Sequence, residues 1–547
     1  MPLISGRSAF LALLRGEGVT HLFGNPGTTE LPIMHALKDF PDLTYVMAMQ
    51  ESLVVAMADG FSRASGQLVA CNVHVAPGLG NAMGSIFNAK FTNTPMLVTA
   101  GQQEQGHGLM EPLLYDPLVR IAEPLVKWSV EVNRLEDLPR IVRRAAKIAL
   151  TPPCGPVFIS LPGDILNAEA DLDLGQPTRV ETKVVPAGGT MRRLADRIAA
   201  SQRPVIVAGD EIVKSDALRE AADFAEALGC PAFQQTIGYG AHFLSESPCY
   251  QGPLPRNHAQ AAALLAGHDL MIVLGADPVR MSVYSPDAAL PAAIPIIHLG
   301  LSTHEFGKNY PAELAVMADL KETLPLLTAA IRETGDDALR SRAAAGISDN
   351  WSTRRRTLVD EISSRSAQMP IDPDWLALSV VEAMPPGAIL VDEGLTSSRH
   401  IPALRAHTER FGYHALASGG IGWGLPAAVG VSLANPGRPV VCYQGDGSAM
   451  YSIQALWTAA HHKLPLTVVL INNGGYRIIK QRLLAFHGDR HFVGMDFADP
   501  PVDFTALARS LGLEAIRITR PDEIDQLAPA FRRPGPRLLE VMVDGSI

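Results

Sequence analysis

Short apolar runs alternate with longer stretches of helical periodicity along most of the chain. The N-terminal part contains five such runs, at residues 21–24, 43–49, 68–75, 95–101 and 156–162. Runs that are apolar throughout are typical of strands covered by helices on both faces. Residues 51–65, between two of the runs, have the pattern of a helix. This alternation predicts βαβ units and therefore a parallel sheet.

The same alternation occurs twice more along the chain. Further apolar runs lie at residues 204–209, 270–276, 295–300, 388–394, 439–448, 466–473 and 536–544. We therefore predict an α/β protein with three doubly wound parallel-sheet domains, at residues 1–170, 186–335 and 370–547. The polar stretches around 163–190 and 334–369 are predicted to be linkers, the second of them helical.

Composition narrows the class of protein. The chain has 547 residues, 47% of them hydrophobic, and a net charge of −10 without a long basic run, which argues against a nucleic-acid partner. No apolar run approaches the ~20 residues that would cross a membrane. The five cysteines form no CxxC pair, and the first residues indicate an amphipathic helix without a signal peptide. A reducing compartment, the cytoplasm, is the predicted location.

One segment predicts a site for a metal and a diphosphate. Asp446, in the turn GDGS, follows one apolar run, and Asn473 ends the next, 27 positions later. A βαβ crossover brings both residues to the carboxyl edge of one parallel sheet, where α/β proteins bind ligands. A carboxylate, an amide oxygen and a backbone carbonyl near Gly475 suit Mg²⁺, which shares its shell with phosphate oxygens. Alone, GDGS would more simply be a tight turn.

The motif GDGS followed by NN resembles the thiamine-diphosphate motif of the decarboxylase and acetolactate-synthase superfamily. Within it, the chain most resembles the benzoylformate decarboxylases. The matching segments are HLFGNPGTTELP (21–32), QESLVVAMADGFSRAS (50–65), NVHVAPGLGNAMG (72–84), LVTAGQQ (97–103), PLVKWS (124–129), ASGGIGWGLPAAVGV (417–431) and GDGSAMYSIQALWTAA (445–460). The resemblance implies a pyrimidine-binding, a central and a diphosphate-binding domain, with thiamine diphosphate and Mg²⁺ as cofactors.

The resemblance also implies cofactor contacts. Glu51 matches the glutamate that hydrogen-bonds the aminopyrimidine and relays protons, although a Glu at a helix start is also favourable by itself. Ile421 matches the apolar residue beneath the bent cofactor, and Gly419 would accept from its amino group. Asp446, Asn473 and Gly475 are the expected metal ligands. The remaining residues expected at the cofactor are Gly445, Gly447, Ser448 and Tyr476.

At the substrate, the chain departs from the family pattern. Thr28 stands where the family has a carboxylate-binding serine, and His74 matches a histidine that transfers protons. Ser282 occupies the place of a second active-site histidine, for which His107 is a possible substitute. Ile479 and Arg482 fall at substrate-pocket positions, but Arg482 could equally face solvent on a charged helix.

These residues predict an enzyme, a lyase that decarboxylates a 2-oxo acid to an aldehyde. Carboligation, of the acetolactate-synthase or benzoin type, and cleavage of a 2-hydroxyacyl thioester share its first steps and are the alternatives. An inactive cofactor-binding protein is the rival from another class, and retention of Glu51, His74, Asp446 and Asn473 argues against it. FAD is not expected. The resemblance implies a homodimer or homotetramer with sites at the subunit interface.

Overall fold

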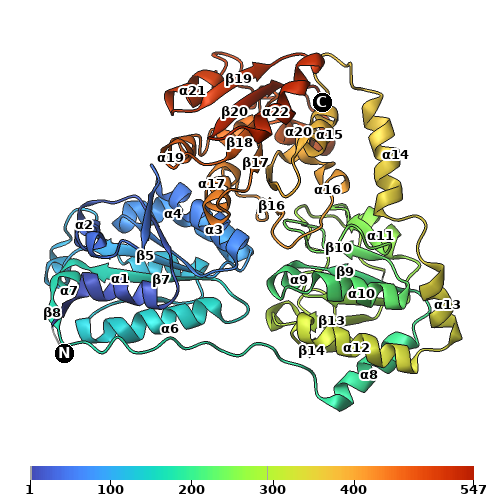
Figure 1. Ribbon diagram of the computed structural model, residues 1–547, viewed down its shortest axis with the longest axis horizontal. Helices are drawn as coiled ribbons and strands as arrows, with labels where there is room; N and C mark the ends of the chain where they lie inside the picture. Colours follow the sequence, from blue (N-terminus) through green and yellow to red (C-terminus); the bar gives the residue numbers. More distant parts are fainter. Residues whose placement is uncertain (1–2, 292) are drawn as a thin grey trace. The chain divides into compact units, whose positions relative to one another are not determined.

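Three six-stranded sheets dominate the structure, a computed structural model that describes residues 3–291 and 293–547 (Figure 1). Strand pairing is parallel throughout the sheet at residues 21–162 and throughout the sheet at residues 204–317. The α/β prediction is therefore confirmed. The chain forms two compact units: one contains residues 1–180, 383–396 and 416–547, and the other contains residues 181–382 and 397–415.

The N-terminal sheet has the strand order β3-β2-β4-β5-β7-β6. Its strands are β2 (His21–Gly24), β3 (Thr44–Met47), β4 (Val69–Val73), β5 (Met96–Gln102), β6 (Ser129–Glu131) and β7 (Pro156–Pro162). The helices around it include α1 (Gly6–Gly16), α3 (Glu51–Ser65), α4 (Val75–Phe91) and α6 (Leu138–Leu150). Five strands coincide with the predicted runs; β6 was missed because it is short and only half-buried.

The C-terminal sheet has the order β16-β15-β17-β18-β20-β19. The strands are β15 (Ile389–Glu393), β16 (Tyr413–Ala415), β17 (Val440–Gly445), β18 (Leu466–Asn472), β19 (Glu514–Ile518) and β20 (Arg537–Met542). The helices that matter for the site are α17 (Gly424–Ala434), α18 (Asp446–Ala449), α19 (Ala455–His461) and α20 (Arg477–His487). The crossover between β17 and β18 thus contains the short α18, which begins at Asp446, and then α19.

The second unit contains the sheet β11-β10-β9-β12-β13-β14. Its strands are β9 (Pro204–Ala208), β10 (Ala232–Gln234), β11 (Tyr250–Pro253), β12 (Leu270–Leu274), β13 (Ile296–Gly300) and β14 (Leu314–Met317). The predicted helical linker contains α13 (Asp337–Ala345) and α14 (Trp351–Ser363). The other predicted linker begins with α7 (Gly163–Asn167) and β8 (Glu169–Ala170), and regular structure resumes at Gly188.

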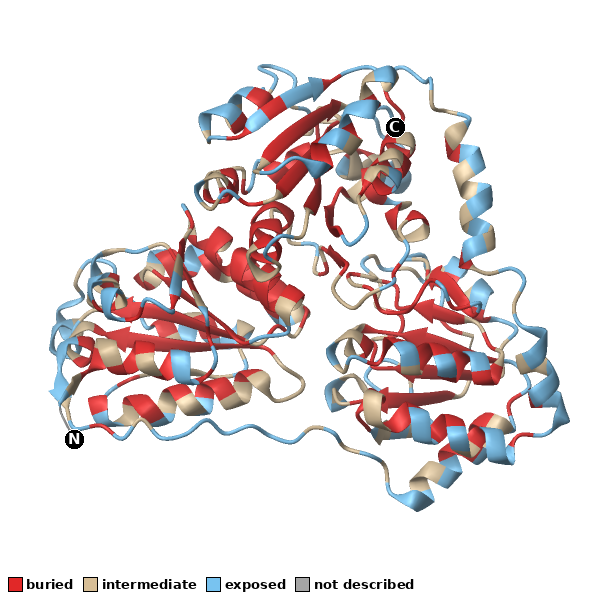
Figure 2. Ribbon diagram, in the orientation of Figure 1, coloured by how far each residue is buried: buried red, intermediate tan, exposed pale blue. Residues whose placement is uncertain are grey.

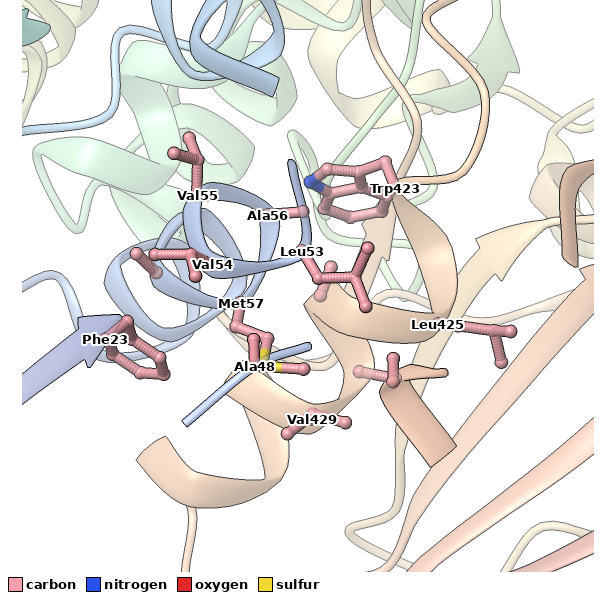
Figure 3. Close-up of a cluster of buried hydrophobic side chains, with 14 of the residues drawn as sticks. Phe23, Ala48, Leu53, Val54, Val55, Ala56, Met57, Trp423, Leu425 and Val429 are labelled. Carbon is pink, nitrogen blue, oxygen red and sulfur yellow. The ribbon is translucent and has the colours of Figure 1, made fainter. Parts of the chain in front are cut away.

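Helices α3 and α17 join the N-terminal and C-terminal sheets within the first unit. Figure 3 shows Leu53 and Met57 of α3 in one buried cluster with Trp423, Leu425 and Val429. Such burial contributes roughly 1.5–3 kcal/mol for each large apolar side chain.

The backbones of these two helices approach closely. A Cβ on Gly60 would lie 2.7 Å from the Ala427 Cα, and a Cβ on Gly430 would lie 2.7 Å from the Phe61 nitrogen. Trp423, at the start of α17, donates its indole N–H to Asp59 Oδ2 at 2.6 Å. Backbone contact and a buried hydrogen bond therefore hold the two helices together.

Burial follows the layers of each unit. Figure 2 shows the strands mostly in the buried colour and the outer helix faces exposed. No helix among residues 3–291 and 293–547 has the length and apolar character needed to span a bilayer.

Candidate cofactor site

The site begins where β17 and β18 end side by side. These strands pair in parallel, with Gly445 opposite Ile471, so their carboxyl ends share one edge of the sheet. Asp446 and Asn473 follow at that edge. The βαβ crossover has the geometry expected from the sequence.

The Asp446 carboxylate organises the turn that follows β18. Its Oδ2 accepts the backbone N–H groups of Asn473, Gly474 and Gly475 at 3.1, 2.8 and 3.2 Å. Its Oδ1 accepts the N–H of Gly447 at 2.8 Å. Burial raises the pKa of Asp446 to about 6, against the effect of these bonds. A cation beside the carboxylate would favour its charged form.

Asn473 offers a second oxygen. Its Oδ1 is buried and has no hydrogen-bond partner, and such orphaned acceptors are rare in proteins. In the described parts of the chain, no three His, Cys, Asp or Glu side chains are grouped to hold a metal. A cation here would depend on Asp446, amide and carbonyl oxygens, and phosphate, which is the donor set that Mg²⁺ prefers. The residues present therefore fit the metal.

Tyr476 closes one side of this edge. Its ring packs against Phe497 with centroids 4.8 Å apart, nearly perpendicular. A Cβ on Gly447 would lie 2.7 Å from the Tyr476 ring, so only glycine fits there. Gly475 is equally restricted, because a Cβ would collide with the Met495 carbonyl.

The loop before α17 carries Gly419 and Ile421. Gly419 and Gly422 have φ angles of 86° and 91°, which side-chain-bearing residues rarely adopt. The Gly420 carbonyl accepts from Asn88 Nδ2 at 3.0 Å. The Gly422 N–H donates to Glu393 Oε1 at 2.6 Å. Ile421 thus lies between two anchored peptide groups.

Glu51 begins α3, next to the carboxyl edge of the N-terminal sheet. It is 6% exposed, and its two oxygens accept from Asn25 Nδ2 at 3.1 Å and Asn81 Nδ2 at 3.0 Å. Both donors are neutral amides. The carboxylate is therefore held in place without an ion pair.

His74 caps α4 and is paired with a buried acid. Its Nδ1 lies 2.7 Å from Glu30 Oε2, and Glu30 is fully buried. Glu30 also accepts the N–H groups of Gly27 at 3.0 Å and Gly101 at 2.9 Å. Because Nδ1 donates to the carboxylate, Nε2 is the nitrogen left to exchange a proton. Val75 has a φ of 46°, a strained value for a β-branched residue and typical of functional turns.

Three family models match the chain: the N-terminal thiamine pyrophosphate (TPP) binding domain of thiamine pyrophosphate enzymes at residues 4–112, the central domain at 191–327 and the C-terminal TPP binding domain at 398–541. The chain belongs to the thiamine pyrophosphate enzymes. Thiamine pyrophosphate is another name for thiamine diphosphate, which is therefore the cofactor of this enzyme.

Individual relatives of the enzyme span nearly its whole length. It is 34% identical over 544 residues to a benzoylformate decarboxylase of Pseudomonas aeruginosa, with 98% of both chains covered. It is 26% identical over 546 residues to the acetolactate synthase large subunit of Buchnera aphidicola, with 96% of this chain and 92% of that one covered. A solved 4-hydroxybenzoylformate decarboxylase of Rhodococcus jostii, thiamine diphosphate-dependent, superposes with a TM-score of 0.88 at 30% identity, over 99% of this chain and all of that one.

The remaining predicted residues of the enzyme are more exposed. Thr28 is exposed, whereas the neighbouring Thr29 places its hydroxyl 3.3 Å from His74 Nδ1. Ile479 and Arg482 are both exposed and lie three residues apart on α20, hence on one helix face. Ser282, in the second unit, and His107 are also exposed. Their roles stay predictions.

The residues that hold Glu51, His74 and the Gly422 amide were not predicted from the sequence. Glu30 lies in the segment GTTELP, and Glu393 ends the run AILVDEG. An acidic residue at the end of a buried strand could have indicated Glu393. Asn25 and Asn81 gave no such signal, because amides in loops are common.

Proposed function

We propose that this enzyme removes CO₂ from a 2-oxo acid without oxidation and releases an aldehyde, as the name of its Pseudomonas relative implies for that protein. The Glu30–His74 pair is the observation that carries this proposal. After CO₂ departs, the reacting carbon must receive a proton, and a histidine held by a buried carboxylate is suited to deliver it. The distance of 2.7 Å between Glu30 Oε2 and His74 Nδ1 orients the ring for that role.

Each half-site has a distinct task in the proposal. When bound, thiamine diphosphate supplies a nucleophilic carbon and an electron sink. Glu51 holds and returns a proton at the pyrimidine ring, in a position set by Asn25 and Asn81. Asp446 and Asn473 hold Mg²⁺, with the Gly475 carbonyl as a third ligand. Ile421 supports the cofactor from below.

A second copy of the chain is part of the proposal. Glu51 and His74 lie at the starts of α3 and α4, whereas the loop with Ile421 contacts their later parts, through Asn88 and Asp59. At about 1.5 Å per helical residue, His74 and Asn88 are about 21 Å apart along α4. One small cofactor cannot bridge that distance, which supports a site completed by a partner's half.

An exposed apolar segment also supports a second copy. Leu109, Met110 and Leu113 are 96%, 76% and 88% exposed, and they follow β5 near the edge that carries His74. Adjacent apolar side chains of this size are usually covered by a partner. We propose that the enzyme is at least a dimer and that a tetramer is formed by two such dimers.

The direct test of the proposed reaction is CO₂ release from a panel of 2-oxo acids by enzyme loaded with thiamine diphosphate and Mg²⁺, with the aldehyde trapped in parallel. We expect benzoylformate to give CO₂ and benzaldehyde in equal amounts. His74→Ala should lower this turnover by about 10²–10⁴-fold. A wild-type enzyme that binds the cofactor but releases no CO₂ from any 2-oxo acid would refute the proposal.

Carboligation is the second candidate. The similarity to an acetolactate synthase and the serine at position 282 favour it, since a site with fewer proton donors would slow protonation and leave more time for a second carbonyl compound to react. Product analysis separates the two functions: CO₂ with a condensed ketone in place of the aldehyde would indicate carboligation.

Mixed dimers test the shared site. Glu51→Gln and Asp446→Ala chains should each be inactive alone. A hybrid of the two would contain one site with both defects and one intact site. Activity should therefore return when the chains are unfolded and refolded together. No recovery, in a sample shown to contain hybrids, would contradict a site built from two chains.

A further inference from the structure

Glu393 is a buried carboxylate that the predicted chemistry does not use. It ends β15 and is 1% exposed. Its Oε1 accepts the Gly422 N–H at 2.6 Å, and its Oε2 accepts the Gly424 N–H. The Gln444 side-chain amide donates to Oε2 at 3.4 Å. These donors are neutral, as is the Ser448 hydroxyl, which also lowers the pKa of Glu393.

Such a group is costly to bury. Removal from water raises the pKa of Glu393 to about 7, despite the hydrogen bonds that favour its charged form. A well-packed apolar residue would avoid this cost. It could not, however, accept two backbone N–H groups that point into the protein, and each would then be left unsatisfied.

The two N–H groups belong to the loop that carries Ile421. Gly422 follows Ile421 directly and is held by Glu393, whereas Gly420 precedes it and is held by Asn88. Gly424 has no room to move toward the strand, since a Cβ there would lie 2.8 Å from the Glu393 Cβ. The peptide groups on both sides of Ile421 are therefore fixed by side chains from two different domains of the first unit.

We propose that Glu393 is a positioning residue for the cofactor, which sets the location of Ile421 by holding the Gly422 and Gly424 amides. The inference rests on the proposed place of Ile421 beneath the cofactor. In this proposal Glu393 acts through the loop and needs no contact of its own with the cofactor.

Glu393→Gln separates this role from a purely structural one. The glutamine has the same shape, but its NH₂ group would face one of the two backbone N–H groups, donor against donor. It also removes a buried charge, so the folded protein should be as stable as wild type or more so at pH 8. A positioning role therefore predicts impaired cofactor binding in a protein that has lost no stability.

The experiment is calorimetric titration of the full-length apoenzyme with thiamine diphosphate at saturating Mg²⁺ and pH 8. Near-ultraviolet circular dichroism of the bound cofactor reports how its two rings are arranged. We expect Glu393→Gln to weaken binding by about 10-fold or more, the effect of one charged hydrogen bond, and to alter the dichroism. Glu17→Gln is the matched control, because Glu17 is a buried carboxylate of the same unit, paired with Arg143 and Arg179. It should leave both readouts unchanged.

Ile421→Ala tests whether Glu393 acts through Ile421. In the double variant, the loss should not exceed that of Ile421→Ala alone, since coupled residues are not additive. Full additivity, or wild-type binding and dichroism in Glu393→Gln, would overturn the inference. If Glu393→Gln does not fold, Glu393→Asp, which keeps the charge but withdraws it, must show the same binding defect. Failure of the wild-type protein to bind the cofactor would instead refute the proposed function.

Discussion

The two halves of the site hold their carboxylates in different ways. In the N-terminal half, side chains do most of this work: Asn25 and Asn81 hold Glu51, and Glu30 is paired with His74 although it also accepts two backbone N–H groups. In the C-terminal half, mainly backbone N–H groups hold the acids. Asp446 accepts four such groups and Glu393 accepts two.

This difference separates chemistry from binding. Where side chains hold an acid, a substitution can alter one proton-transfer group while the backbone stays in place. A half-site made of backbone amides depends on chain conformation, so one altered acid disturbs a whole turn. We therefore expect substitutions in the N-terminal half to affect turnover and those in the C-terminal half to affect cofactor affinity.

The largest effect should come from Asp446→Ala. The change removes a proposed metal ligand and leaves four backbone N–H groups without their acceptor. Loss of a residue that only orients a metal ligand lowers metal affinity by up to about 100-fold. Loss of the ligand itself should therefore lower cofactor affinity by more than about 100-fold. Calorimetry with thiamine diphosphate and Mg²⁺ measures this. Unchanged affinity would remove Asp446 from the metal site.

Glu51→Gln should have the opposite profile. The neutral side chain keeps one acceptor oxygen, so thiamine diphosphate should bind within a few-fold of the wild-type affinity. Turnover should fall by about 10²–10⁴-fold, because proton relay at the pyrimidine is lost. Steady-state kinetics together with calorimetry give both values. A loss of affinity as large as that of Asp446→Ala would erase the contrast between the halves.

The pH dependence of stability should reveal Glu393. Its pKa in the folded protein, about 7, lies above the usual 4.5, so the folded chain keeps a proton that the unfolded chain releases. Stability is therefore lost as the pH rises from about 4.5 to about 7, by up to roughly 3 kcal/mol. Glu393→Gln lacks this loss and should melt at a higher temperature than wild-type apoenzyme at pH 8, but not at pH 5. A difference in melting temperature that is the same at pH 5 and pH 8 would show that it does not come from the ionisation of Glu393.

Glu30→Gln should give the smallest effect. The amide oxygen still accepts from His74 Nδ1, but the charge is gone and the NH₂ group would face the Gly101 N–H, so the ring is oriented less firmly. We expect kcat to fall by roughly 10-fold with cofactor affinity unchanged, in proportion to one charge-assisted hydrogen bond. Glu17→Gln, which neutralises a buried carboxylate of the same unit that is paired with Arg143 and Arg179, is the control for the loss of a buried charge. An affinity loss in Glu30→Gln would show that the acid supports the binding site as well.

Most strands could be predicted because they are buried on both faces. The runs that became β4, β5 and β18 are apolar from end to end. β10 and β14 were not predicted because they are short, and β19 was not predicted because its Glu514, Ile516 and Arg517 are exposed. β14 and β19 are also edge strands, which need fewer apolar residues, so their pattern is weaker.

The site was predictable where local geometry determines it. Asp446 and Asn473 lie on one βαβ crossover, and the strand ends bring them together without long-range information. Glu30 and His74 are 44 residues apart and meet only because β2 and β4 are neighbours in the sheet. Periodicity does not encode which loops meet at an edge, so this pair emerged only from the structure.

The close crossing of α3 and α17 has a consequence for mutational scanning. Gly60 and Gly430 take part in no chemistry, yet a single methyl group on either would collide with the backbone of the other helix. In a library of all single substitutions scored for growth or turnover, these two positions should tolerate as little as Asp446. On low tolerance alone, the two glycines would be wrongly assigned to the catalytic centre. The fraction of each variant that still folds should bind the cofactor normally. That result would show that Gly60 and Gly430 are needed for the packing of two domains and not for the chemistry.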